Sequence, residues 1–243
     1  MYATVPLPAL LKASGFVVFA VFAVLLVAMG IPSNTSDWVR RFTLTLTVAG
    51  LVIAVVFGPT SPRWAVWRWV WRVFPILNEM LFPDLNGTWA GKGESNWSRV
   101  KHLRDAACAS KKIDPEHIDQ IQLTDFEILV FIKASLFDLK ILAKLGNTNS
   151  TSFSKSARVS KGGDDKFRLD YSYDQQTREI ASLDESNHEG AASLVVEQCN
   201  RRLIGRYWTR RMWHVGLNTA GNFNLAKVDD GRTKFEEAMA PRD

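Results

Sequence analysis

The sequence predicts a membrane-anchored all-β protein, in which an N-terminal two-helix transmembrane hairpin is followed by a small antiparallel β-barrel of about eight strands. Two uncharged apolar runs, 13–31 and 42–58, lie in the first quarter of the chain. From residue 85 onward, apolar residues tend to recur at every second position, which is typical of strands with one buried face. The only cysteines, Cys108 and Cys199, are too few for a disulfide framework.

The basic character of the chain resides in its N-terminal part. The formal net charge is +5, and the first 80 residues hold six basic and two acidic side chains. The remaining 163 residues hold 24 basic and 23 acidic side chains and are therefore nearly neutral. This balance gives no support for binding of a nucleic acid polymer by the body of the protein.

The two apolar runs predict a pair of transmembrane helices. Run 13–31 is just long enough for a hydrocarbon core of about 30 Å at about 1.5 Å per residue, and the polar turn 32–41 separates it from run 42–58. A cleaved signal peptide is the alternative for the first run, and the second run would then remain as the anchor. Basic residues outside the pair outnumber those in the turn, which predicts a multi-pass protein with both termini and the barrel in the cytoplasm. The outer set is Lys12, Arg63, Arg68 and Arg72, and the turn holds Arg40 and Arg41.

The second apolar run carries a stripe of small residues, Gly50, Ala54 and Gly58, spaced four apart. Small residues at this spacing allow another helix to approach closely. Two partners fit the stripe: the first helix of the same hairpin, or a second copy of the chain.

Segment 59–82 combines tryptophan with arginine. Four of the nine tryptophans lie within 64–71. On a helix, Trp64, Trp67 and Trp71 share one face, with Arg68 and Arg72 beside them. Because tryptophan favours the membrane–water boundary and arginine favours anionic headgroups, we expect an interfacial amphipathic helix and a linker here. Continuation of the second spanning helix is the alternative.

Residues 83–243 are expected to form the barrel. The segments read as strands are 87–97, a single long bent strand over 127–144, 151–159, 167–173, 191–198, 201–212 and 222–228. Strict alternation places Phe167, Leu169, Tyr171 and Tyr173 on one face. Closure into a barrel would remove exposed strand edges, and barrels of about eight strands can hold one small ligand.

No catalytic or metal-binding constellation stands out in this body, so we predict that the protein is not an enzyme and needs no cofactor. The four histidines lack metal-ligand spacing, and the sequence contains neither a nucleophile elbow nor a phosphate-binding loop. Strand 201–212 instead suits a flat anionic ligand, because alternation places Tyr207, Thr209 and Arg211 on one face. An arginine binds phosphate and an aromatic ring stacks on a base. An ordinary amphipathic strand with its arginines in solvent remains the alternative.

The layout resembles a known family, the two-transmembrane β-barrel effectors of bacterial CBASS anti-phage defence. The residues that carry the resemblance are Asp84-Leu-Asn-Gly-Thr-Trp89, Ser152 and Ser154, Phe167-x-Leu-x-Tyr-x-Tyr173, His188-x-Gly190, and Leu203-x-Gly-x-Tyr-Trp-Thr-x-Arg211. The resemblance implies that a nucleotidyltransferase makes a cyclic dinucleotide, which the barrel binds. It further implies that the protein then oligomerises in the inner membrane, disrupts the bilayer and causes abortive infection. The charged stretch 98–118 departs from the pattern, and we expect it to cover a barrel mouth.

These considerations lead to a specific site hypothesis. The residues assigned to the ligand are Tyr171, Tyr173, Ser154, Tyr207, Thr209 and Arg211. The competing function is a membrane-anchored, lipocalin-like carrier of a lipid or small hydrophobic ligand. The carrier predicts an interior dominated by Phe167, Leu169 and aromatic residues, with Arg211 outside.

Overall fold

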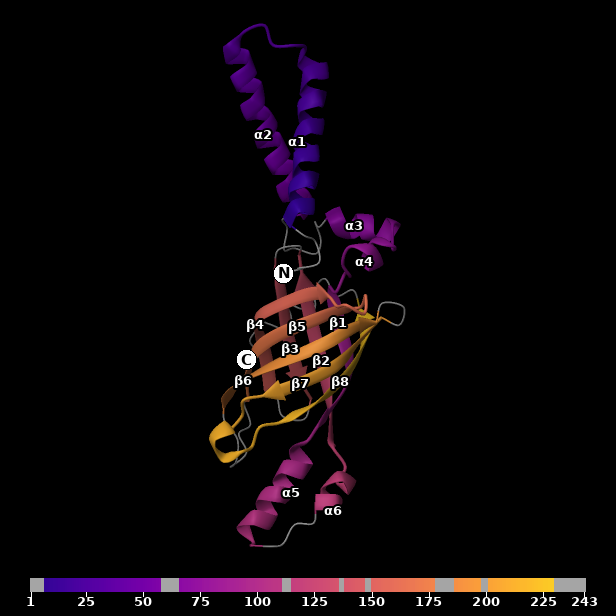
Figure 1. Cartoon of the computed structure of the whole chain (residues 1–243), viewed down its shortest axis with the longest axis vertical. Helices are drawn as coiled ribbons and strands as arrows, with labels where there is room; N and C mark the ends of the chain where they lie inside the picture. Colours follow the sequence, from indigo (N-terminus) through magenta and orange to yellow (C-terminus); the bar gives the residue numbers. More distant parts are fainter. Residues whose placement is uncertain are drawn as a thin grey trace, which may run out of the picture.

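The computed structural model describes residues 7–57, 66–110, 115–135, 138–146, 150–177, 186–197 and 201–229. Its elements in chain order are α1 (Leu7–Met29), α2 (Thr35–Phe57), α3 (Val66–Val73), α4 (Leu77–Met80), β1 (Gly87–Ser95), α5 (Trp97–Cys108), α6 (Pro115–Gln120), β2 (Thr124–Ala134), β3 (Leu139–Leu145), β4 (Ser150–Lys161), β5 (Phe167–Gln176), β6 (Asn187–Glu197), β7 (Arg202–Thr209), η1 (Trp213–Val215) and β8 (Ala220–Asp229). Gly58, Trp64 and Cys199, which the sequence singled out, lie outside the described residues. Figure 1 shows α1 and α2 at one end, the barrel in the middle, and α5 and α6 at the other end. We call these two ends of the barrel the hairpin end and the distal end.

The N-terminal helices form a hairpin whose turn is shorter than expected. The second helix begins at Thr35 rather than at residue 42, because Asn34 caps it: the side-chain oxygen of Asn34 accepts a hydrogen bond from the Asp37 amide at 2.9 Å. Of the described helices, one is long and apolar enough to cross a membrane, over Thr35–Val55, and the apolar part of α1, Ser14–Met29, is shorter.

Helix α1 packs against a different face of α2 from the small-residue stripe. The buried contact face of α2 contains Thr45 and Ala49. The Arg41 guanidinium donates to the α1 carbonyl of Met29 at 2.9 Å and also to that of Gly30, which satisfies carbonyls that the helix end leaves without a partner. Gly50 and Ala54 are exposed, and a Cβ added at Gly50 would meet nothing within 4 Å. The partner expected from the same hairpin is therefore not on this stripe.

The eight-stranded antiparallel barrel is confirmed. Each strand pairs with the next in sequence, and β8 returns to pair with β1, which closes the sheet. The alternation expected in β5 is also confirmed: Phe167, Leu169, Tyr171 and Tyr173 are all buried, at most 6% exposed. Closure leaves no free sheet edge among the eight strands, so the inward-facing residues share one interior.

The expected single bent strand over 127–144 is wrong, because this segment folds into the hairpin of β2 and β3. Val130 lies opposite Ala143 in the antiparallel register. The turn is closed by Ser135 and Asp138: the Ser135 amide donates to the Asp138 carbonyl at 2.8 Å, and the Asp138 amide donates to Ser135 Oγ at 2.9 Å. The apolar stretch around the turn hides it, since the turn contains neither glycine nor proline.

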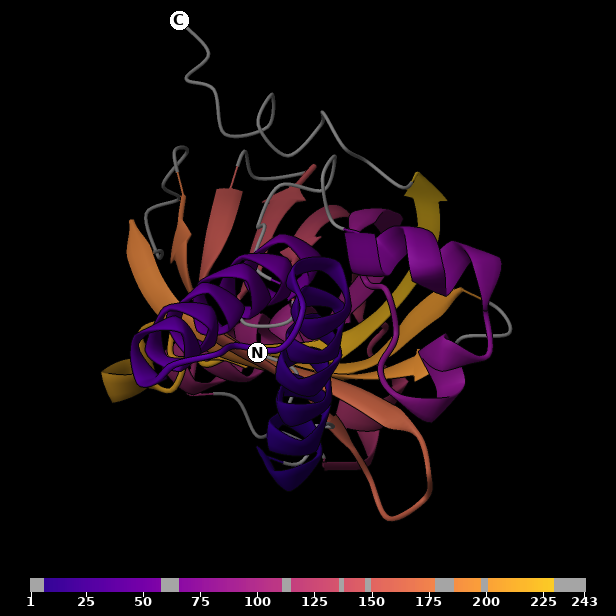
Figure 2. The ribbon, with the colours of Figure 1, turned by 90° about the horizontal axis from the view of Figure 1, so that it is seen from above.

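The segment α3–α4 packs on the hairpin end of the barrel, where Trp67 and Trp71 join the barrel core. Their rings lie 5.5 and 4.8 Å from that of Phe82, and Trp71 Nε1 donates to the Phe82 carbonyl at 2.9 Å. Trp69, on the opposite face of α3, is 66% exposed. Seen from above, α1 and α2 lie over this end of the barrel, with α3 and α4 beside them (Figure 2).

The stretch Asp84–Trp89 joins this segment to the first strand. The Asn86 side chain exchanges two hydrogen bonds with the backbone of Ala134 at the end of β2, at 2.9 and 2.7 Å. Gly87 adopts a φ of 134°, which side chains rarely tolerate. Trp89 then enters the core, and its indole nitrogen donates to the Leu85 carbonyl at 3.0 Å. Leu85 and Trp89 thus join the hydrophobic core at the hairpin end of the barrel.

Candidate functional site

The distal half of the barrel interior contains a cavity of about 280 Å³. All eight strands contribute to its wall, together with the first residue of α5. The lining residues are Ser95, Trp97, Thr124, Phe126, Ile128, Ala143, Leu145, Ser150, Ser152, Tyr171, Tyr173, Gln175, Thr177, His188, Tyr207, Thr209, Arg211, Thr219 and Phe223. The wall is therefore a mixture of aromatic rings and hydroxyl groups, with one arginine.

Aromatic rings pack on one another across two parts of this wall. Tyr207 and Phe223 are stacked, with ring centroids 4.5 Å apart and planes inclined by 13°. Phe126 meets both of them edge-on, at 5.9 and 6.1 Å. On β5, two strands away from β7 in the sheet, the rings of Tyr171 and Tyr173 lie 5.8 Å apart. Such packing fixes the rings in place, so the cavity presents rigid aromatic surfaces.

The three tyrosines of the cavity are neutral donors at physiological pH. Burial raises the pKa of Tyr171 and of Tyr173 well above the ordinary tyrosine value. Burial also raises the pKa of Tyr207, although a hydrogen bond with Ser95 and the nearby charge of Arg211 oppose this shift. Each phenol thus keeps its proton and can donate a hydrogen bond to a ligand.

Hydroxyl groups occupy the wall between the rings. Ser150 Oγ donates to Thr177 Oγ1 at 3.1 Å, and the hydroxyls of Thr209 and Thr219 are 2.8 Å apart. These buried groups satisfy one another's hydrogen-bonding capacity. A hydroxyl both donates and accepts, so the same groups suit the polar edge of a base.

Arg211 is the basic residue of the cavity wall. Its guanidinium carbon lies 4.9 Å from the centroid of the ring of Trp97, the first residue of α5. Helix α5, which begins one residue before the charged stretch 98–118, thus supplies one aromatic wall residue at the distal end. Helices α5 and α6 extend away from the barrel (Figure 1). A partly buried guanidinium is well suited to an anion such as phosphate, because it offers planar, bidentate donors.

The structure brings together five of the six residues that the sequence assigned to the ligand: Tyr171, Tyr173, Tyr207, Thr209 and Arg211. Ser154 does not line the cavity. It lies opposite Tyr173, but its hydroxyl accepts a hydrogen bond from the Ile141 amide at 2.9 Å. The hydroxyls that reach the cavity from β4 are those of Ser150 and Ser152.

The sequence did not predict several of the residues that line the cavity. Phe126 and Phe223 look like ordinary strand residues, and Trp97 lies immediately before the charged stretch 98–118. His188 was noted only as part of the His-x-Gly pattern, yet it is buried in the cavity wall. Alternation alone places a residue inside the barrel without showing which half it faces. Within the described ranges, no group of three His, Cys, Asp or Glu side chains could hold a metal ion.

Comparisons with known proteins agree with this arrangement. The family described as "Cap15, cyclic dinucleotide receptor domain" matches residues 80–227. The chain is 30% identical over 179 residues to CD-NTase-associated protein 15 of Escherichia albertii. The aligned region covers 72% of this chain and 75% of that protein. No solved structure matches. The matched region contains β1 to β7, most of β8 and the whole wall of the distal cavity. The chain therefore belongs to the family of the Cap15 cyclic dinucleotide receptor domain.

Proposed function

We propose that this protein is a cyclic-nucleotide-sensing effector of anti-phage defence, and that its distal cavity binds a cyclic dinucleotide made by a nucleotidyltransferase. The observation that carries the proposal is the convergence of Tyr171, Tyr173, Tyr207 and Arg211 on one cavity. Aromatic faces suit the bases and the guanidinium suits a phosphate. Membership of a cyclic dinucleotide receptor family supports the same ligand class.

The size of the cavity suggests that only part of the ligand would enter it. At about 280 Å³ it lies at the lower limit of ligand sites, which are about 300–1,000 Å³. We infer that one base enters between the tyrosines while the phosphates stay at the mouth beside Arg211. In this arrangement the protein acts by binding alone, without catalysis.

The membrane part of the proposal concerns α1 and α2. Binding is proposed to drive self-association of copies in the bacterial inner membrane, bilayer disruption and abortive infection. The exposed faces of Gly50 and Ala54 support contact between copies, since α1 packs elsewhere on α2. The basic residues that flank the hairpin support the orientation in which the barrel and both termini are cytoplasmic.

Two observations weigh against the carrier. Phe167 and Leu169 belong to the filled core and do not line the cavity, whereas Arg211 does. An apolar ligand would offer no hydrogen-bond acceptor to this arginine and would bury polar side chains against hydrocarbon.

Thermal unfolding tests the ligand class. The full chain in detergent would be unfolded in the presence of cyclic di- and trinucleotides, their linear analogues, and fatty acids. A ligand that binds only the folded protein adds about 2.7 kcal/mol at a hundredfold excess over its Kd, so the midpoint rises. We expect a rise with a cyclic dinucleotide and none with its linear form. A rise with fatty acids alone would support the carrier.

A further inference from the structure

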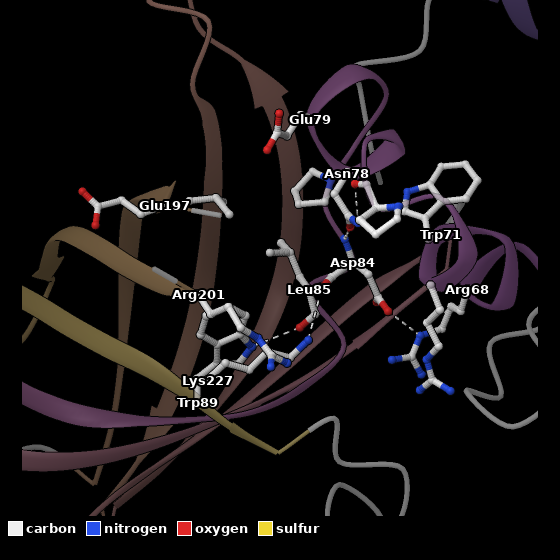
Figure 3. A pocket seen from close by; sticks show the side chains of 14 residues that line it. Arg68, Trp71, Asn78, Glu79, Asp84, Leu85, Trp89, Glu197, Arg201 and Lys227 are labelled. Carbon is white, nitrogen blue, oxygen red and sulfur yellow. Dashed lines mark hydrogen bonds and ion pairs between the residues drawn. The ribbon is translucent and has the colours of Figure 1, made fainter. Parts of the chain in front are cut away.

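A second cavity, of about 460 Å³, lies at the hairpin end of the barrel, between α3–α4 and the strand ends. Its lining includes four basic side chains, those of Arg68, Arg72, Arg201 and Lys227, together with the rings of Trp71 and Trp89. Figure 3 shows residues from α3, α4 and the barrel around this space. None of its residues lines the distal cavity, so the proposed nucleotide site leaves it unexplained.

Arg68 is the most unusual residue of this second cavity, because its charged side chain is only 1% exposed. The Arg68 Nε donates to Asp84 Oδ2 at 2.7 Å. The two terminal nitrogens, Nη1 and Nη2, are also buried and have no hydrogen-bond partner among the residues that the structure describes. Buried guanidinium nitrogens require acceptors, so the arrangement lacks an acceptor for one side of this cation.

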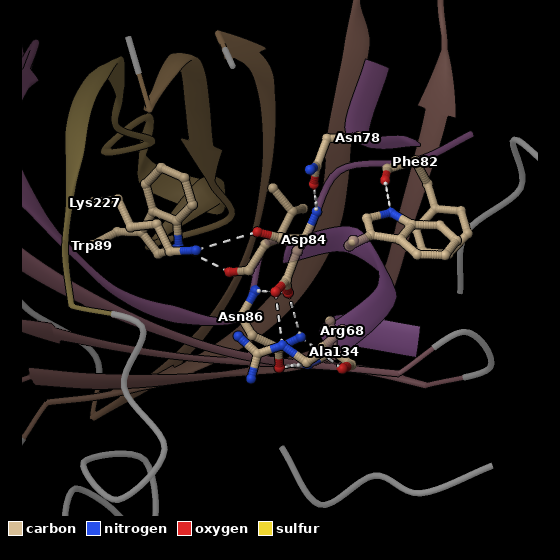
Figure 4. A network of polar contacts seen from close by, with 10 residues as sticks. Arg68, Asn78, Phe82, Asp84, Asn86, Trp89, Ala134 and Lys227 are labelled. Atoms are coloured by element: carbon tan, nitrogen blue, oxygen red, sulfur yellow. Dashed lines mark hydrogen bonds and ion pairs between the residues drawn. The ribbon is translucent and has the colours of Figure 1, made fainter. Parts of the chain in front are cut away.

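Asp84 cannot supply that acceptor, because other donors engage it. Its Oδ1 accepts from the backbone amide of Asn86 at 3.1 Å and from the Asn86 side chain at 2.8 Å. The Asp84 amide donates to Asn78 at 2.9 Å, and Lys227 Nζ donates to the Asp84 carbonyl at 3.3 Å. Figure 4 shows this network around Asp84. Asp84 therefore fixes Arg68 through Nε and leaves the Nη1–Nη2 edge for a second anion.

We propose that this cavity binds a phosphate group. A phosphate offers paired oxygens that match the Nη1–Nη2 edge of a guanidinium, and a second arginine, Arg72, lines the same space. The carboxylates of Glu79 and Glu197 also line the cavity, but they lie away from Arg68 (Figure 3).

The surroundings indicate that a lipid headgroup presents this phosphate. The outer face of α3–α4 is apolar and exposed, at 66% for Trp69, 60% for Ile76 and 66% for Met80. This face lies near the foot of the hairpin (Figure 1). Basic pockets beside membrane helices bind anionic headgroups. This source of the phosphate rests on the proposed insertion of α2 into the membrane, whereas the phosphate site itself does not.

The test uses the full chain in a nonionic detergent and follows its thermal unfolding. The probes are inorganic phosphate, dihexanoyl phosphatidic acid, and dihexanoylglycerol, which lacks the phosphate. We expect phosphatidic acid to raise the unfolding midpoint and dihexanoylglycerol to leave it unchanged. R72Q should raise the half-saturating concentration about tenfold, as loss of one charge-assisted hydrogen bond would. The matched control R206Q, on the outer face of β7, should respond like the original protein.

A double variant protects the test against misfolding. R68Q alone would leave Asp84 without its cation, whereas R68Q/D84N removes both charges together. We expect the double variant to remain folded, with a cooperative transition, and to lose the response to phosphatidic acid.

The outcomes separate the sources of the phosphate. A response to inorganic phosphate but not to phosphatidic acid would support the phosphate site and overturn the lipid source. No response to either probe, or an equal response in R68Q/D84N, would overturn the site. A cyclic dinucleotide response that R68Q/D84N loses and R211A keeps would assign this cavity to the nucleotide, which would overturn both this proposal and the distal nucleotide site.

Discussion

The Arg211 guanidinium lies over the ring of Trp97, 4.9 Å from its centroid, and so joins the segment after β7 to the first residue of α5. Both residues line the distal cavity. The pair explains how helix α5, which follows β1, reaches the proposed ligand site. It also holds the arginine side chain at the cavity before any ligand binds, because a cation is attracted to the face of an aromatic ring.

The first prediction concerns this arginine. R211A should weaken binding of the activating cyclic dinucleotide at least about tenfold, because it removes a charge-assisted hydrogen bond to phosphate. Calorimetric titration of the full chain would measure the change. R210A is the matched control, since Arg210 is exposed and does not line this cavity. Equal affinity in R211A and the original protein would refute the site assignment.

The second prediction concerns Gly190, which lies directly opposite Tyr173. A Cβ at this position would lie 2.4 Å from the Tyr173 ring, so G190A should push the ring into the cavity. We expect weaker nucleotide binding in a protein that still folds cooperatively. A191V adds bulk to the other face of the same strand and should bind normally. Unaltered binding in G190A would show that the position of Tyr173 is not critical for the ligand.

The third prediction compares a glycine that has no room for a side chain with a glycine that has room for one. A Cβ at Gly205 would lie 2.0 Å from the Ser193 carbonyl oxygen and 2.8 Å from the Leu194 Cα, and these backbone atoms cannot rotate away. G205A should destabilise the barrel by about 2 kcal/mol or more. Gly163, in the turn between β4 and β5, has nothing within 4 Å of an added Cβ. G163A should therefore unfold within about 0.5 kcal/mol of the original protein in urea.

The fourth prediction is a loss of stability at alkaline pH. Burial raises the folded-state pKa of Tyr171, Tyr173 and Tyr207 above the unfolded value of about 10. Above that pH the unfolded chain releases these protons while the folded barrel keeps them. These tyrosines therefore leave the free energy of unfolding unchanged below about pH 10. Above that pH the free energy of unfolding falls as pH rises through the folded pKa values.

Ultraviolet difference absorbance of tyrosinate measures this effect. The chain has four tyrosines, so ionisation of three should coincide with alkaline unfolding. Y171F should make the fall in stability with pH less steep. Ionisation of all four tyrosines in a folded barrel would contradict the prediction.

The fifth prediction tests assembly in the membrane. G50L adds bulk to the exposed small-residue stripe, where nothing lies within 4 Å of an added Cβ. We expect it to block ligand-dependent cross-linking of copies in liposomes and to leave nucleotide affinity unchanged. G15L is the matched control, because Gly15 on α1 is equally open. Normal cross-linking in G50L would exclude this stripe as the contact between copies.

Local patterns in the sequence were enough to predict the class of the fold. Charge-free runs and period-two alternation report which environment a segment occupies, and both are local properties. They were sufficient for the helices, for the eight-stranded barrel and for the inward face of β5. They failed at the turn between β2 and β3, because Ser135 and Asp138 close it through hydrogen bonds within an apolar stretch.

The candidate site depended more strongly on tertiary structure. Alternation placed Tyr171 and Tyr207 on inward faces, but only the register of the strands decided that they line the same half of the interior. The strand expected over 201–212 ends at Thr209, so Arg211 reaches the cavity from the segment after β7. That register also placed Ser152 at the cavity and left the Ser154 hydroxyl bonded to the Ile141 amide.

The roles of tryptophan were decided by packing alone. The sequence showed an amphipathic segment around Trp67 and Trp71, and a lipid surface and a protein core are equally apolar partners for such a face. The closed barrel buried these rings against Phe82 and placed Arg68 beside Asp84. A sequence records which face of a segment is apolar. Which surface covers that face depends on residues distant in the chain, and only the tertiary structure brings them together.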